Sequence, residues 1–280
     1  MAANKRYGPM PDRDQISVVV GTIVLGFTLV RVIDLPVREI GTQALGSAIG
    51  LRLTTAVVML IVLGALAATG TDSLLRSHPK SQAQPQAGTF ILWILPVFTV
   101  LVLELGLSRL AEEQSLVWWL GLAASAGMIA LVLAAEYVSL DAEHWAYDTT
   151  QVLLTGLAYT VALVLFTAIY ATKERALLTA TLSSAVAAAV ALRLLWMHSR
   201  QLLRALLYAG IVGAGVGEAM WALGYGRAAP LAAGLVLLLL LYIGTGLSQA
   251  ALEKTFGRRT VIELGIVAAI AAAIILRYVL

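Results

Sequence analysis

Four charged side chains lie inside apolar stretches that are long enough to cross a membrane: Arg31, Glu104, Glu218 and Arg277. Each falls near the C-terminal end of an odd-numbered stretch, so all four share one leaflet if every stretch spans the bilayer. A charge in hydrocarbon costs roughly 2.5–3.5 kcal/mol at mid-depth unless it is paired or hydrated. Two acids and two bases on one side therefore predict a neutralised polar cluster that binds a ligand or couples to an ion.

Each acid of this cluster has a functional and a structural interpretation. Glu104 has apolar neighbours on both sides, which suits proton coupling in a wet cavity, but an ion pair with a basic residue such as Arg31 would leave it inert. Glu218 suits a proton or cation ligand, a general acid/base, or simply the partner of Arg31 or Arg277. Trp221, three residues further on, shares a neighbouring helix face with Glu218 and joins the candidate binding residues.

Glycines surround Glu218 in the same stretch. Gly213 and Gly217 form a small-xxx-small face that lets another helix approach closely. They are not a phosphate-binding loop, because such a loop needs a preceding strand and an opening helix. We expect Glu218, which adjoins this face, to point toward another helix rather than toward lipid.

A second polar group follows the fourth apolar stretch. Hard metal ions bind carboxylate and imidazole side chains, but the spacing here matches no metal-binding loop with an obligate glycine turn. The alternative is charge pairing with basic loops on the same side of the membrane. The weak metal candidates are Asp141, Glu143, His144 and Asp148.

The composition excludes an ordinary soluble domain. Apolar residues make up 60% of the 280 positions and charged residues 12%, whereas about 25% charged is usual for soluble domains. The chain has no cysteine and three scattered histidines, so thiolate chemistry and a histidine-rich metal centre are excluded and we expect no cofactor. The net charge of +3 is ordinary for basic membrane loops and indicates no nucleic-acid partner.

The apolar pattern predicts an all-α integral membrane protein. About 20 apolar residues cross 30 Å of hydrocarbon as a helix. An interfacial hairpin or re-entrant loop is predicted between the first two helices, on either side of residues 45–48. We predict nine transmembrane helices over residues 15–34, 53–71, 89–108, 115–136, 150–171, 176–195, 204–223, 228–250 and 261–279.

Residues 1–280 are predicted to form a single polytopic membrane domain. Residues 1–14 form a basic N-terminus that is expected in the cytoplasm, and residues 73–88 a flexible hydrophilic loop. Lys and Arg are more frequent in the loops that share the N-terminus's side of the membrane than in those on the other side. This favours a cytoplasmic N-terminus and, with nine spans, an extracytoplasmic C-terminus. The polar cluster would then lie in the outer leaflet.

Several short motifs resemble those of an uncharacterised family of bacterial multi-pass membrane proteins. The resemblance extends over most of the chain. It implies a bacterial inner-membrane location and supplies no catalytic residue. The motifs are Asp34-Leu-Pro36, Glu136-Tyr137, Glu218-Ala-Met-Trp221, Pro230, Tyr242-Ile-Gly-Thr-Gly246, Gly257-Arg-Arg and Glu263-Leu-Gly.

Three functions agree with these patterns. The first is handling of a small solute, ion or lipid, such as transport, through the polar cluster. The second is a non-enzymatic accessory or scaffold subunit, in which the buried charges only lock helices together and the partners are membrane lipids and a membrane protein or a second copy. The third is an intramembrane lipid or glycan enzyme with Glu104 or Glu218 as its acid/base, although no enzyme motif is present.

Overall fold

The structure is a computed structural model of the 280-residue chain. It describes residues 12–33, 36, 38–44, 47–79, 88–110, 116–198, 201–253, 265–267, 269 and 273. The chain forms two compact units, which are described separately. Unit 1 comprises residues 1–89 and 96–150, and unit 2 comprises residues 90–95 and 151–280.

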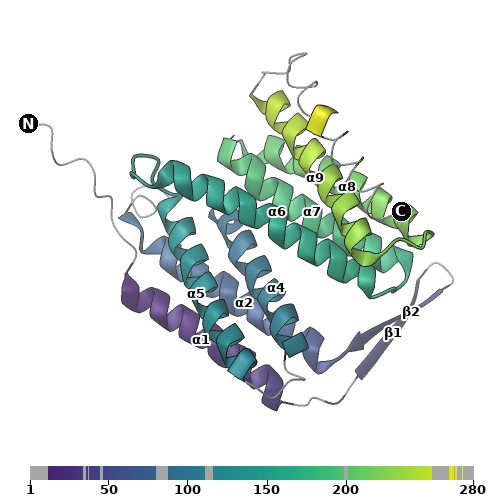
Figure 1. Ribbon diagram of the computed structural model, residues 1–280, viewed down its shortest axis with the longest axis horizontal. Coiled ribbons are helices and arrows are strands. Elements are labelled where there is room, and N and C mark those ends of the chain that lie inside the picture. The colour runs from purple at the N-terminus through teal and green to yellow at the C-terminus, as the bar shows by residue number, and fades with distance from the viewer. Residues whose placement is uncertain are drawn as a thin grey trace, which may run out of the picture. The chain divides into compact units, whose positions relative to one another are not determined.

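Unit 1 contains four membrane-length helices and a hairpin (Figure 1). The first helix begins after Asp12, whose side chain accepts a hydrogen bond from the backbone N–H of Asp14 and so caps the helix. A short 3₁₀ turn, η1, leads directly into α4. The elements are α1 (Arg13–Val32), β1 (Arg38–Ala44), β2 (Ser47–Leu53), α2 (Thr55–Arg76), η1 (Thr89–Trp93), α4 (Ile94–Leu110) and α5 (Leu116–Val138), of which residues 90–95, in η1 and at the start of α4, belong to unit 2.

The two strands confirm the predicted hairpin between the first two spans. They pair antiparallel, with Arg38 opposite Leu53 at the open end and Ala44 opposite Ser47 at the closed end. Gly41 and Gly50 face each other in the middle of the pair. Residues 47 and 48, which the prediction placed between the two halves of the hairpin, belong to β2.

Unit 2 contains four consecutive helices (Figure 1). The last of them begins with Pro230, which fits the first helical turn because its missing N–H would have no partner there. The helices are α6 (Tyr147–Ala171, of which residues 147–150 belong to unit 1), α7 (Ala176–His198), α8 (Leu202–Gly224) and α9 (Pro230–Leu252).

Eight helices of the described residues are long and apolar enough to cross a membrane. They coincide with the first eight predicted spans, and they show a polytopic α-helical membrane protein. The second helix continues to Arg76 rather than ending at residue 71, so the predicted loop over residues 73–88 begins several residues later. The predicted ninth span, 261–279, lies outside the described residues except for a few helical positions.

The core of unit 1 is an apolar cluster contributed by all four helices. Ile23 and Phe27 of α1, Leu63 of α2, Val100 of α4 and Ile129 of α5 are all buried in it. The packing is tight where α1 meets α2, since a Cβ at Gly70 would overlap the side chain of Val19. This cluster fixes which faces of α4 and α5 point inward.

Candidate functional site in unit 1

Glu104 is the one member of the predicted polar cluster that is buried among the described residues. It lies on α4, six residues before Leu110, hence about 9 Å from the end of that helix. The side chain is 6% exposed. Its Oε2 atom is buried and has no hydrogen-bond partner among the described residues.

The surroundings of Glu104 are apolar. Val100, one turn before it, and Leu107, one turn after it, belong to the unit 1 core cluster. Leu107 also packs near Gly121 of α5. A carboxylate enclosed in this way has lost hydration without gaining an ionic partner from the described residues, and binding a proton or a cation would offset that cost.

Arg31 lies at the end of α1, where a positive charge interacts favourably with the helix dipole. Its guanidinium group stands 4.9 Å from the centre of the Trp118 ring, in a cation–π contact. The side chain is exposed, and the described residues provide no carboxylate partner for it. Asp34, the nearest acidic residue in sequence, lies outside the described residues, so an acidic partner for Arg31 stays a prediction.

Glu218 lies on α8 in unit 2, and its side chain is exposed. None of the described helices covers it, and the expectation that it faces another helix stays a prediction, because most of the predicted ninth span lies outside the described residues. Ala214, one turn before it, and Trp221, one turn after it, are exposed on the same side. Arg277, the fourth member of the predicted cluster, lies outside the described residues.

The glycines beside Glu218 do pack against a helix, as predicted. A Cβ at Gly213 would lie 2.7 Å from the Ala188 Cβ, and one at Gly217 would lie 2.9 Å from the Ser184 Cβ. Both contacts are with α7. Successive helix positions are 100° apart, so Glu218 is turned away from the face that its glycine neighbours bury.

A comparison with protein families identifies what the chain is related to. Residues 35–278 match the model of a family described as Protein of unknown function (DUF5656). The chain belongs to this family. No curated protein and no solved structure matches it.

The DUF5656 match covers Glu104, Glu218 and Arg277, whereas Arg31 precedes it. The family is uncharacterised, in agreement with the resemblance found in the sequence. The family description assigns no chemical role to these residues.

Three of the weak metal candidates of this DUF5656 chain, Asp141, Glu143 and His144, fall in the turn after α5, and Asp148 lies in the first turn of α6. The Asp141 carboxylate accepts a hydrogen bond of 3.0 Å from the backbone N–H of Glu143, and His144 Nδ1 accepts one of 3.2 Å from the N–H of Ala146. No group of three or more acidic or histidine side chains among the described residues is arranged to hold a metal. Asp141 and His144 shape the turn, as short polar side chains commonly do.

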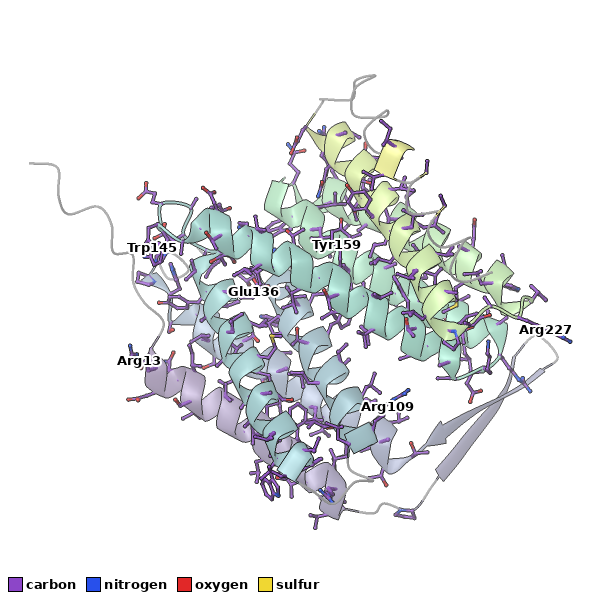
Figure 2. All side chains as sticks on the ribbon, in the orientation of Figure 1. Arg13, Arg109, Glu136, Trp145, Tyr159 and Arg227 are labelled. Atoms are coloured by element: carbon purple, nitrogen blue, oxygen red, sulfur yellow. The ribbon has the colours of Figure 1, made fainter. Side chains whose placement is uncertain are left out.

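The sequence analysis did not recognise as one polar group the residues His78, Glu136 and Tyr137, which lie near the C-terminal ends of α2 and α5. The His78 and Tyr137 rings meet edge to face, with centroids 4.5 Å apart, and both side chains are buried. Glu136, labelled on α5 in Figure 2, is fully buried beside Tyr137 in the sequence. The sequence held a signal for this group. His78 lies two residues after the end of α2 and Glu136 two residues before the end of α5, and the C-terminal ends of these even-numbered spans share a side of the membrane if every helix crosses it.

Proposed function

We propose that the protein handles a small solute or ion within the membrane, with Glu104 as the group that takes up and releases a proton or small cation. The observation that supports this role is the buried Oε2 atom without a hydrogen-bond partner among the described residues. A helix-locking carboxylate needs a basic partner, and the described residues supply none to Glu104. We further infer a bacterial inner-membrane location with a cytoplasmic N-terminus, which the distribution of Lys and Arg supports.

The test is ion movement across vesicles that contain the purified protein. A potassium diffusion potential drives uptake, and a pH-sensitive dye inside the vesicles reports protons, with Na⁺ supplied in a parallel assay. We expect uptake by the wild type and little or none by Glu104→Gln, with the melting temperature nearly unchanged. Glu143→Gln, which neutralises an exposed acid of unit 1, is the control and should behave as the wild type.

Infrared spectroscopy adds a reading that does not require transport. If Glu104 exchanges a proton, the band of a protonated carboxyl group should change with pH in the wild type and disappear in Glu104→Gln. Absence of both ion uptake and this band in the wild type would reject the proposal. A large fall in the melting temperature of Glu104→Gln with unchanged uptake would instead favour the scaffold function.

A further inference from the structure

Unit 2 buries polar atoms for which the described residues provide no hydrogen bond. Three of them are Oε1 of Gln151 and Oγ1 of Thr167 on α6, and Oγ of Ser183 on α7. An unpaired polar group costs free energy in an apolar interior, and native structures commonly satisfy such groups with ordered water. These atoms therefore have capacity for a small hydrogen-bonding molecule.

Hydroxyl groups of α6 are turned toward α9 inside unit 2. The hydroxyl groups of Tyr159 and Thr245 are 2.9 Å apart. Thr167 Oγ1 lies against Gly234 of α9, where an added Cβ would overlap it. The contact between α6 and α9 is therefore polar both near the middle of α6 and toward its end.

The polar groups lie at successive depths of unit 2. Measured from the C-terminal end of α6 with a 1.5 Å rise per residue, Thr167 lies at about 6 Å and Tyr159 at about 18 Å. Ser183 is fully buried and lies about 10 Å after the start of α7, which begins where α6 ends, so it falls between these two levels. Thr155 and Gln151 continue the row along α6 to about 24 and 30 Å. Neighbouring levels differ by only about 4–8 Å, so a small molecule can pass from one group to the next.

The buried charge of unit 2 does not suit a cation. Arg193 is 2% exposed and is the only charged side chain buried among the described residues of this unit. A guanidinium stays protonated, and a fixed positive charge inside a membrane protein opposes the passage of cations and protons. Hydroxyl and amide groups both donate and accept hydrogen bonds, so the row suits a neutral molecule.

We propose that unit 2 binds and conducts a small neutral hydrogen-bonding solute along this row, with Thr167 and Ser183 among the groups that hold it. The row replaces the hydrogen bonds that the solute loses when it leaves water. Tyr159 and Thr245 present hydroxyl groups to it near the middle of α6. This conduction goes beyond the ion-handling role of Glu104 and does not depend on it.

The first test measures the entry of urea and glycerol into vesicles that contain the purified full chain. Stopped-flow light scattering records how fast the vesicles swell again after mixing with either solute. We expect faster entry than in protein-free vesicles, and a fall of up to about tenfold in Thr167→Val and in Ser183→Ala, as for the loss of one hydrogen bond. Thr160→Val is the matched control, because this exposed hydroxyl of α6 already donates to the Gly156 carbonyl oxygen, and it should behave as the wild type.

The second test needs no variant that has to fold. Water-edited solid-state NMR of the wild type detects which side chains receive magnetisation from water. We expect the signals of Thr167 and Ser183 to receive it, although both side chains lie inside the unit. Comparison with spectra of Thr167→Val and Ser183→Ala assigns the two signals.

Three results overturn the proposal. They are entry of both solutes no faster than in protein-free vesicles, unchanged entry in Thr167→Val and Ser183→Ala, and dry Thr167 and Ser183 side chains in the NMR spectra. The last result would assign these hydroxyl groups to helix packing alone. Glu104→Gln should leave urea and glycerol entry unchanged, so failure of conduction through unit 2 and failure of ion handling are separate results.

Discussion

In unit 2, the hydroxyl groups of Tyr159 and Thr245 form a hydrogen bond between two spans. Thr245 donates its hydroxyl proton to its own helix, with 2.8 Å to the Leu241 carbonyl oxygen and 3.0 Å to that of Tyr242. Since Thr245 has only one hydroxyl proton, we assign Tyr159 as the donor in the 2.9 Å contact between the two hydroxyls, although the geometry allows either direction. Tyr159, labelled on α6 in Figure 2, thereby ties α6 to α9.

This direction predicts unequal costs for the two obvious substitutions. Tyr159→Phe removes the donor and leaves Thr245 bonded to its backbone, so we expect a loss of only about 0.5–1 kcal/mol. Thr245→Val leaves the Tyr159 hydroxyl without its acceptor and should cost about 1–3 kcal/mol. Unfolding in mixed micelles measures both. Equal losses, or a larger loss for Tyr159→Phe, would contradict the assigned direction.

The position of an acid along a span was easier to predict than the face on which it lies. Glu104 and Glu218 each stand six residues before a helix end, where the sequence placed them, yet one is buried and the other exposed. In a bilayer the residues that face lipid are as apolar as those that face the core, so hydrophobic periodicity does not separate the two faces. Only contacts between distant segments reveal the face.

Helix ends and the hairpin were predictable because their signals are local. Apolar length defines a span, and the glycine-rich alternation between the first two spans predicted a hairpin. The end of α2 was placed too early, at residue 71, where the apolar run stops before Asp72. In the structure its carboxylate accepts a 2.6 Å hydrogen bond from Arg76, one turn later, so the charged pair extends the helix.

The α7–α8 interface gives a prediction with an internal control. Gly213→Ala would place a methyl group 2.7 Å from the Ser184 carbonyl oxygen, which must shift, and we expect a loss of about 1–3 kcal/mol. Gly210→Ala lies on the same helix in open space and should be neutral or slightly stabilising. The melting temperatures of the two variants test this prediction. Equal values would show that α7 and α8 pack less closely than the distances at Gly213 indicate.

The number and order of spans predict which loops share a side of the membrane. Glu174 follows the fifth of the eight helices and Arg227 the seventh, whereas Ser139 follows the fourth. With a cytoplasmic N-terminus, Glu174 and Arg227 are extracytoplasmic and Ser139 is cytoplasmic. Figure 2 labels Arg227 in the segment between α8 and α9.

Labelling of single cysteines tests this topology, and the chain needs no prior substitution because it has no cysteine. In intact cells, an impermeant maleimide should react with cysteine placed at 174 or 227, and with cysteine at 139 only after permeabilisation. The opposite labelling pattern would show that the protein has the inverse orientation in the membrane. Reagent access to a cysteine added after Leu280 would establish the side of the C-terminus and, with it, whether the ninth span crosses.

The close packing of α7 against α8 also bears on the order in which the protein assembles. The two helices are consecutive, so Gly213 can meet Ser184 as soon as α8 has left the ribosome. The Tyr159–Thr245 bond joins residues 86 positions apart and has to wait for α9. Because nearby contacts form before distant ones, α7 and α8 are expected to enter the bilayer as a pair onto which α6 and α9 later dock. A fault in that pair would therefore lead to early degradation of the nascent chain rather than to a mature protein with reduced activity.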